Sequence, residues 1–194
     1  MLVKLYKDNP DPRLIDRIVE VLRDGGLIIY PTDSIYAIGC DIFHARAVEQ
    51  VCRLKGLPVE KANLSFVCRD LSHIAEFARI STPVFKLMKS CLPGPYTFIL
   101  KSSSLLPKPF KQKKTVGIRV PDNPIALAIV EALGNPLLSM TLKDENDEVE
   151  YYCDPSLIDE RYGARVSLVV DGGPGGYEPT TVIDCTGDEP VQLR

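Results

Sequence analysis

Apolar and polar positions recur along this chain with two periods, one typical of helices and one typical of buried strands. The helical period is clearest after Asp11-Pro12, where a capping residue precedes a proline at the first helical position. The apolar face that follows consists of Leu14, Ile15, Ile18, Val19 and Leu22. The pattern predicts a helix that ends at Gly25-Gly26.

The same criteria divide the rest of the chain into alternating elements. Further helices are predicted over residues 45–54, 71–78, 83–92, 125–133 and 155–161. Strands are predicted over residues 27–30, 64–68, 96–101, 115–120, 137–142, 166–170, 181–185 and 191–193. The acidic stretch 144–150 predicts an exposed loop, and the glycine-rich run 172–176 predicts a flexible turn.

This alternation, without repeats or a low-complexity linker, predicts one α/β domain over residues 1–194. Two pairs of successive strands have no helix between them, so the sheet is predicted to be mixed. A chain of 194 residues with 45% hydrophobic and 25% charged residues can bury a core of ordinary size. No apolar run approaches the ~20 residues that span a bilayer, so no membrane partner is expected. The first eleven residues do not resemble a signal peptide, so we expect a cytoplasmic protein.

The positions of the cysteines and histidines limit which metal sites and catalytic groups the chain can form. The six cysteines form no Cys-x-x-Cys pair, and His44 and His73 are the only histidines. A metal site is therefore not expected, and the cysteines are predicted to be buried reduced thiols. Neither histidine stands beside an obvious nucleophile, which also disfavours Ser-His-Asp and Cys-His catalysis.

The net charge of −3 gives no global attraction to nucleic acid. One local exception is the segment 108–114, which holds four lysines in seven residues. Such a run is either a solvated loop or a patch that contacts phosphates.

The first candidate for chemistry follows the apolar run 27–29. Thr32, Asp33 and Ser34 stand where a parallel strand would end, and open α/β sheets bind ligands beyond the carboxyl ends of their strands. Pro31 is expected to stop sheet pairing, and Gly39 is expected to permit a turn. The alternative is an ordinary polar transition from strand to loop.

Similar polar residues stand near the ends of other predicted elements. They are Lys55, Thr115, Arg119, Ser139, Thr141, Thr180, Thr181 and Arg194. Hydroxyl, ammonium and guanidinium groups suit carboxylates and phosphates, and such a site would act by positioning and electrostatic stabilisation. Each residue also has a simpler explanation, such as strand propensity or a salt-bridged surface.

Four segments in order carry a resemblance to a known family. They are Pro31-Thr32-Asp33-Ser34-Ile35-Tyr36-Ala37-Ile38-Gly39, Pro93-Gly94-Pro95-Tyr96-Thr97-Phe98-Ile99-Leu100, Thr115-Val116-Gly117-Ile118-Arg119-Val120-Pro121, and Asp171-Gly172-Gly173 followed by Thr180-Thr181-Val182-Ile183-Asp184. Together they resemble the YrdC-like family, which includes the threonylcarbamoyl-AMP synthases, and within it the YciO branch. The resemblance covers the chain from Leu14 to Arg194.

The resemblance implies a twisted mixed sheet flanked by helices, with a concave ligand face and a fold like that of double-stranded-RNA-binding proteins. The synthases join L-threonine, bicarbonate and ATP, the last with Mg²⁺, into threonylcarbamoyl-AMP and release pyrophosphate. Their product feeds transfer RNA modification. The family is also associated with binding double-stranded RNA.

The resemblance also implies roles for individual residues. The predicted substrate-binding residues, for L-threonine or a related amino acid, are Ser34, Arg119, Ser139 and Thr180. The predicted nucleotide-binding residues are Lys55, Thr115, Thr141 and Arg194, with Lys55 also expected to be catalytic.

The chain departs from the family pattern on the nucleotide side. The family's lysine-x-arginine pair reads Lys55-Gly56-Leu57, and its serine-x-asparagine pair reads Ser139-Met140-Thr141. An asparagine-proline pair has no clean match around residues 61–63, and a nearby histidine is replaced by Phe66. The missing arginine alone removes a charge-assisted contact worth roughly 1.5–3 kcal/mol. We therefore expect threonine to bind better than ATP.

Three functions fit these observations. The first is an adenylate-forming synthase that acts on threonine or a related amino acid. The second is a double-stranded RNA-binding module with little catalysis, which would use Lys86, Lys89, Lys101 and the lysines of segment 108–114. The third is a sensor that binds an amino acid or nucleotide without turnover.

Overall fold

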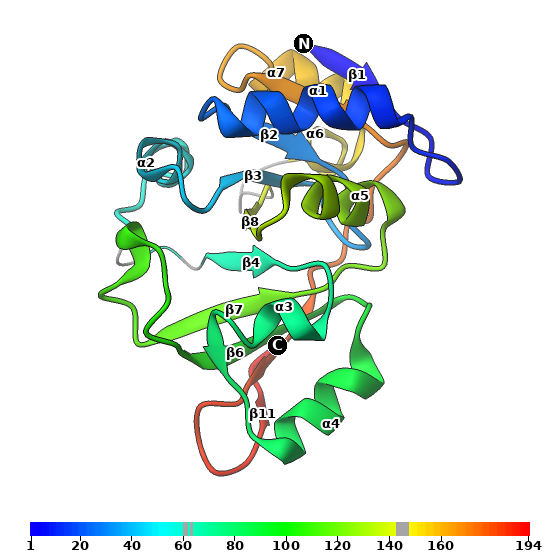
Figure 1. Ribbon diagram of the computed structural model, residues 1–194. Coiled ribbons are helices and arrows are strands. Elements are labelled where there is room, and N and C mark those ends of the chain that lie inside the picture. Colours follow the sequence, from blue (N-terminus) through cyan, green and yellow to red (C-terminus); the bar gives the residue numbers. More distant parts are fainter. Residues whose placement is uncertain (60–61, 63, 143–147) are drawn as a thin grey trace.

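The computed structural model describes residues 1–59, 62, 64–142 and 148–194 (Figure 1). Most of its helices follow the predicted amphipathic segments. The helices are α1 Pro12–Arg23, α2 Ala45–Leu54, α3 Leu71–Ile74, α4 Thr82–Cys91, α5 Pro124–Leu133, α6 Glu150–Cys153 and α7 Pro155–Tyr162, with a 3₁₀ turn at Lys108–Phe110. In the described part of the chain, no helix is long and apolar enough to cross a membrane.

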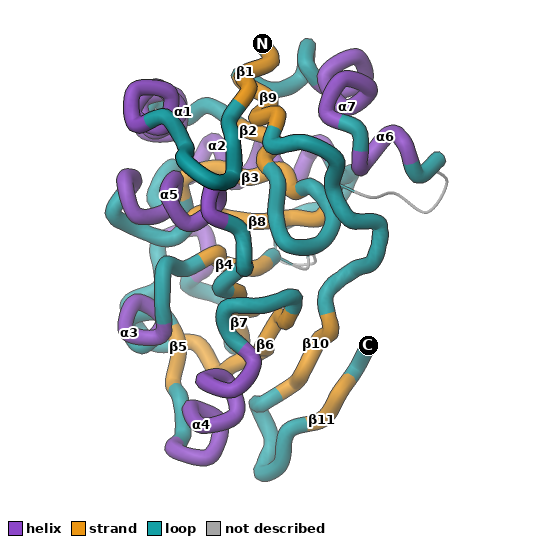
Figure 2. Tube along the Cα trace, turned by 90° about the vertical axis from the view of Figure 1, so that its right-hand side faces the viewer, coloured by secondary structure: helices purple, strands orange, loops and turns teal. Residues whose placement is uncertain are grey.

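The described strands form one sheet. They are β1 Leu2–Lys4, β2 Ile28–Tyr30, β3 Ala37–Asp41, β4 Ser65–Val67, β5 Ala78–Arg79, β6 Tyr96–Ser102, β7 Thr115–Arg119, β8 Leu137–Thr141, β9 Leu168–Asp171, β10 Thr181–Asp184 and β11 Val191–Gln192. Their spatial order is β1-β9-β2-β3-β8-β4-β7-β6-β10-β11, and β5 pairs with β6. Figure 2 shows the strands following one another down the molecule, from β9 near the N-terminus to β11 near the C-terminus.

The pairing of these strands is both parallel and antiparallel. β2 runs parallel to β9 but antiparallel to β3, and β4 runs parallel to β7 but antiparallel to β8. The prediction of a mixed α/β sheet flanked by helices is therefore confirmed. Buried residues of α1 and α5 belong to one hydrophobic cluster, whereas buried residues of α2, α3, α4 and α7 belong to the other.

Two hydrophobic clusters occupy the two faces of the sheet. Ile28 and Tyr30 of β2 belong to the cluster that includes α1 and α5, whereas Ile29 between them belongs to the cluster that includes α2. This alternation follows from the two-residue period of a strand. Because β2 is buried on both faces, it reads in sequence as a continuous apolar run.

Polar side chains cap the N-termini of two of the predicted helices. Asp11 accepts a hydrogen bond from the Arg13 N–H at 2.9 Å, and Asn123 accepts from the N–H groups of Ile125 and Ala126 at 3.0 and 3.1 Å. A proline follows both caps, as expected where the first helical N–H has no intrahelical acceptor. α2 begins and ends at the predicted residues.

The prediction of a turn at Gly39 was wrong. Gly39 lies in the middle of β3 and pairs with Ile28 of β2 on one side and with Ser139 of β8 on the other. A Cβ at this position would overlap the carbonyl oxygen of Leu138 and lie 2.9 Å from the Tyr30 ring. Gly39 is therefore required for close packing within the sheet and not for a turn.

Other predicted boundaries also need correction. The helix predicted over residues 71–78 ends at Ile74, and Ala78–Arg79 form β5, which pairs with Ser102 and Lys101. The predicted acidic loop falls partly on residues 143–147, outside the described residues, and Glu150 begins α6. Strand β1 was not predicted, although it pairs parallel with β9.

All six cysteines lie in the described part of the chain, and none forms a disulfide. Cys40, Cys52 and Cys68 are buried as predicted. The prediction of burial was wrong for the other three, Cys91, Cys153 and Cys185, which are only partly buried.

Replacing Gly39 by alanine tests the close packing of β2, β3 and β8. We expect Gly39→Ala to lower the free energy of unfolding by about 1–3 kcal/mol, because the new methyl group overlaps backbone that cannot move aside. Urea denaturation measures this loss. Gly187→Ala is the control, since the nearest atom to its Cβ is 3.9 Å away, and a similar loss in both variants would contradict the interpretation.

Candidate functional site

A pocket of about 330 Å³ opens on the sheet beside the ends of β4, β6, β7, β8 and β10. Its described lining combines hydroxyls, three cations and a few apolar side chains. The lining residues are Ala62, Leu64, Ser65, Thr97, Ile99, Lys113, Thr115, Gly117, Arg119, Ser139, Thr141, Thr180, Val182, Leu193 and Arg194. No aspartate or glutamate is among the described residues of this lining.

The strand period explains which side chains face the pocket. On β7, Thr115, Gly117 and Arg119 line it, whereas Val116 and Ile118 are buried in the opposite cluster. β8 behaves in the same way, with Ser139 and Thr141 toward the pocket.

Small residues on adjacent strands form the floor of the pocket. Ser65 of β4 pairs with Gly117 of β7 on one side and with Ser139 of β8 on the other. Gly39 of β3 extends this row beyond Ser139. Because none of these side chains is large, the sheet leaves open space above them.

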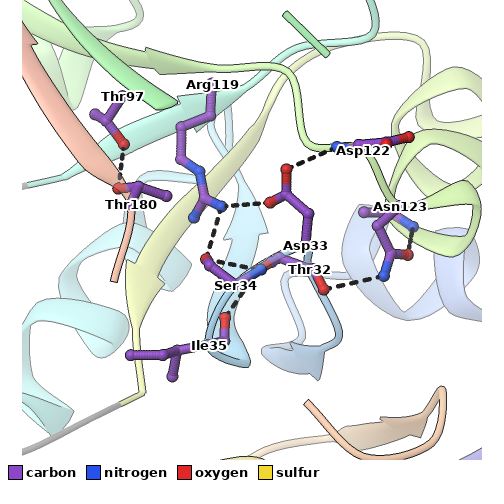
Figure 3. A network of polar contacts seen from close by, with 10 residues as sticks. Thr32, Asp33, Ser34, Ile35, Thr97, Arg119, Asp122, Asn123 and Thr180 are labelled. Atoms are coloured by element: carbon purple, nitrogen blue, oxygen red, sulfur yellow. Dashed lines mark hydrogen bonds and ion pairs between the residues drawn. The ribbon is translucent and has the colours of Figure 1, made fainter. Parts of the chain in front are cut away.

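The central polar contact of the site is a buried ion pair between Arg119 and Asp33 (Figure 3). A terminal nitrogen of Arg119 donates to Asp33 Oδ1 at 3.0 Å and to Ser34 Oγ at 3.0 Å. The two charged side chains are only 6% and 8% exposed. Arg119 Nε is also buried and has no hydrogen-bond partner among the described residues.

The loop that carries Asp33 is fixed to the start of α5 (Figure 3). The Asp122 N–H donates to Asp33 Oδ2 at 2.8 Å, and Asn123 Nδ2 donates to the Thr32 carbonyl at 3.1 Å. Within the loop, Thr32 Oγ1 donates to the Ile35 carbonyl at 2.9 Å. Asn123 thus caps α5 and holds the loop at the same time.

The glycine run after β9 packs against the same loop. The Gly176 N–H donates to the Ser34 carbonyl at 2.9 Å, and Tyr36 Oη donates to the Gly173 carbonyl at 2.7 Å. A Cβ on Gly172 would lie 2.6 Å from the Pro31 ring. The predicted flexible turn is therefore a closely packed support for the Ser34 loop.

The structure brings most of the predicted site residues together. Arg119, Ser139, Thr180, Thr115, Thr141 and Arg194 line the pocket, and Ser34 lies behind Arg119. Thr180 exchanges a 2.8 Å hydrogen bond with Thr97, and Arg194 Nε donates to the Thr180 carbonyl at 3.1 Å. The ligands that these residues bind stay predictions.

Lys55 is the exception. Its Nζ donates to the Leu142 carbonyl at 2.9 Å, and it lines a separate cavity with Ile38, Arg161 and Arg165. Leu57 is exposed and Phe66 is buried among other aromatic rings, so neither lines the pocket. Lys61 and Asn63 lie outside the described residues.

Sequence reasoning did not assign several residues of the site. Asp33 stood in the segment that the sequence singled out, but nothing local showed that its partner is Arg119. Asn123, which caps α5 and donates to the Thr32 carbonyl, was not assigned to the site. Ser65, Thr97 and Lys113 also line the pocket, and the two-residue strand period could have indicated the first two.

Because Arg119 and Asp33 form a buried ion pair, we expect removal of the Asp33 carboxylate to lower the free energy of unfolding strongly. Asp33→Ala leaves the Arg119 charge buried without its partner, and we expect the free energy of unfolding to fall by about 3–5 kcal/mol. Urea denaturation is the measurement. Asp70→Ala is the control because the Arg69–Asp70 pair is half exposed, and we expect it to change stability by about 1 kcal/mol or less. Equal losses in the two variants would contradict a structural role for the buried pair.

A second prediction concerns Tyr30, which is fully buried and whose hydroxyl has no hydrogen-bond partner among the described residues. Burial raises the pKa of Tyr30 from 10.0 to about 12. The unfolded state therefore releases this proton first as pH rises above 10, and stability falls between pH 10 and 12. At pH 11 this amounts to about 1 kcal/mol.

Tyr30→Phe removes this titration. Relative to pH 8, the variant should lose about 1 kcal/mol less stability at pH 11 than the parent protein in urea denaturation. At pH 8 the substitution should cost little, since it removes one buried hydroxyl and leaves the packing of the ring in place. The same alkaline loss in both proteins would show that Tyr30 does not carry it.

Comparisons with known proteins agree with this architecture. The model of the Sua5/YciO/YrdC family, described as telomere recombination, matches residues 20–194. The uncharacterised protein YciO of Escherichia coli (strain K12) is 46% identical over 192 residues, which cover 98% of this chain and 92% of YciO. The threonylcarbamoyl-AMP synthase of Bacillus subtilis (strain 168) is 30% identical over 95% of this chain and 53% of that enzyme.

Two solved structures have the same fold. The crystal structure of E. coli YciO superposes with a TM-score of 0.91 at 44% identity, over all of this chain and 94% of the other. P. abyssi Sua5 complexed with L-threonine superposes with a TM-score of 0.88 at 24% identity, over all of this chain and 57% of the other. From the family match and the YciO identity, we conclude that this chain belongs to the Sua5/YciO/YrdC family.

Proposed function

We propose that this protein binds L-threonine or a closely related amino acid and joins it to the adenylyl group of ATP, as a threonylcarbamoyl-AMP synthase does. The observation that carries the proposal is the pocket itself. It places Arg119, Ser139 and Thr180 around one end, and Thr115 and Arg194 contribute to the same lining.

The Arg119 end suits an amino acid. Arg119 is held in one orientation by Asp33 and Ser34, and its Nε is a buried donor with no protein acceptor among the described residues. A substrate carboxylate could accept from it, since charge-assisted hydrogen bonds of this kind are strong. Ser139 and Thr180 add hydroxyls that can both donate and accept. P. abyssi Sua5, which has the same fold, was solved with L-threonine.

The proposed chemistry requires positioning more than proton transfer. The threonine amine attacks the carbon of bicarbonate and water leaves, which gives a carbamate on the threonine nitrogen. A carbamate oxygen then attacks the α-phosphorus of ATP, and pyrophosphate leaves. The described lining offers cations and hydroxyls that can stabilise the negative charge that develops on phosphate oxygens. It contains no carboxylate to hold a metal, so Mg²⁺ would enter bound to the phosphates of ATP.

The nucleotide side is the weaker half of the proposal. Lys55, the predicted catalytic residue, is bonded to the Leu142 carbonyl outside the pocket, and Leu57 brings no charge. We therefore propose that ATP binds more weakly than the amino acid, with slow adenylate formation. Binding of RNA stays a prediction of the sequence, since no contact among the described residues favours it.

Isothermal titration calorimetry with L-threonine tests the amino-acid end. We expect the parent protein to bind L-threonine, and we expect Ser139→Ala to weaken binding about tenfold, because one hydrogen bond to a charged ligand is lost. Ser104→Ala is the control, since Ser104 is exposed and lines no described pocket. Absence of threonine binding by folded parent protein would contradict the proposal.

The companion measurement is pyrophosphate release from L-threonine, bicarbonate and ATP. Release that depends on all three substrates would support the synthase reaction. Threonine binding without any release would instead favour a sensor that binds the amino acid without turnover.

A further inference from the structure

Gly39 leaves space in the middle of β3, and the side chain of Tyr30 occupies it. A Cβ on Gly39 would lie 2.9 Å from Cε1 of Tyr30, an atom in the outer half of the ring, next to the carbon that carries the hydroxyl. Tyr30 ends β2 and pairs with Ala37 of β3, so its side chain reaches Gly39 diagonally. Aromatic side chains are long enough for such a diagonal contact. The ring of Tyr30 therefore crosses β3 above Gly39.

This crossing brings the Tyr30 hydroxyl toward Ser139. β8 lies on the far side of β3 from β2, and Ser139 of β8 pairs directly with Gly39. The side chains of directly paired residues point to the same face of a sheet, so the Ser139 hydroxyl lies on the face that the Tyr30 ring covers. Burial raises the pKa of Tyr30 to about 12, whereas the Ser139 side chain and the Arg119 charge act in the opposite direction, as expected for groups that face the phenol.

Two buried polar atoms at this end of the pocket have no hydrogen-bond partner among the described residues. One is the hydroxyl of Tyr30, a residue with no exposed surface, and the other is Nε of Arg119. Leaving a buried polar group unpaired costs stability, so such atoms are rare in folded proteins. Their occurrence at the same end of one pocket indicates that this end is built to form hydrogen bonds when a ligand arrives.

We propose that Tyr30 is a positioning residue of the amino-acid end, which donates to Ser139 Oγ and so directs the Ser139 hydrogen toward the carboxylate of the bound amino acid. The assignment rests on the proposed function for the identity of the ligand. Tyr30 is fully buried, whereas Ser139 lines the pocket, so Tyr30 acts on the ligand through Ser139.

The chemistry of the two hydroxyls supports this order. A serine hydroxyl can accept one hydrogen bond and donate another at the same time. When Ser139 accepts from Tyr30, its own hydrogen is left for the ligand. Hydrogen bonds in such a chain polarise one another, which strengthens the bond that Ser139 donates. The raised pKa of Tyr30 keeps its proton in place at neutral pH.

The test is a double-mutant cycle in the full-length chain, with the affinity for L-threonine measured by calorimetry at pH 8. Its members are the parent protein, Tyr30→Phe, Ser139→Ala and the double variant. Tyr30→Phe removes only the hydroxyl and keeps the ring above Gly39. Tyr36→Phe is the matched control, because it also removes a buried tyrosine hydroxyl, but one that donates to the Gly173 carbonyl.

We expect Tyr30→Phe to weaken L-threonine binding about three- to tenfold, because the Ser139 hydroxyl loses the donor that orients it. In the Ser139→Ala background the same substitution should change the affinity by less than about 1.5-fold, since the group through which Tyr30 acts is gone. Tyr36→Phe should change the affinity by similar factors, within about twofold, in the two backgrounds, because its hydroxyl bonds elsewhere.

Three results would overturn the assignment while leaving the proposed function in place. They are unchanged threonine affinity in Tyr30→Phe, an equal loss in both backgrounds, and a coupling of the same size between Tyr36 and Ser139. An equal loss in both backgrounds is what a purely structural role of Tyr30 would give. Absence of threonine binding by the parent protein is a different result, which would overturn the proposed function and the assignment together. Urea denaturation at pH 8 establishes that each variant is folded.

Discussion

The buried ion pair between Arg119 and Asp33 is the interaction on which the site depends. Arg119 ends β7 and Asp33 lies in the loop after β2, so the pair joins two parts of the sheet that are separated by β3, β8 and β4. Burying two charges costs several kcal/mol per ion unless each is well bonded. Here Asp33 accepts from Arg119 and from the Asp122 backbone, while Ser34 accepts from Arg119. These hydrogen bonds offset the cost of desolvating the two charges. They also keep the guanidinium of Arg119 in one orientation in the pocket.

The same pair explains why the surrounding loops are so constrained. Asn123 holds the Thr32 carbonyl, and the glycine run after β9 closes over Ser34 and Pro31. None of these contacts needs to touch a ligand. Their shared effect is to leave Arg119 few alternative orientations, which lowers the entropy lost when a carboxylate binds. A site that works by positioning benefits from such support more than a site that works by proton transfer.

The sequence could predict those features that depend on local pattern. The ends of α2 were predicted correctly because its apolar face repeats with the helical period and Gly56 follows it closely. β3 was missed because Gly39, in its middle, was taken as a turn residue, whereas Gly39 pairs with both β2 and β8. The role of Asp33 could not be predicted, since its partner is 86 residues away and only the fold brings them together. For Lys55, the motif predicts a role at the nucleotide, and that role stays a prediction for a side chain whose ammonium group donates to the Leu142 carbonyl.

The fold depends on Arg119 much more strongly than on the exposed residues around the pocket. At the Arg119 end the cation, its carboxylate and the loop that carries it are mutually dependent, so a substitution there costs stability as well as binding. Arg194, another cation of the described lining, is exposed and donates to the Thr180 carbonyl near the Arg119 end. A change such as an arginine replaced by Leu57, itself exposed, leaves the core intact. A substitution at such an exposed position therefore leaves the buried ion pair and the loops around it undisturbed. The departure from the family pattern at Leu57 is for this reason compatible with an intact Arg119 end of the pocket.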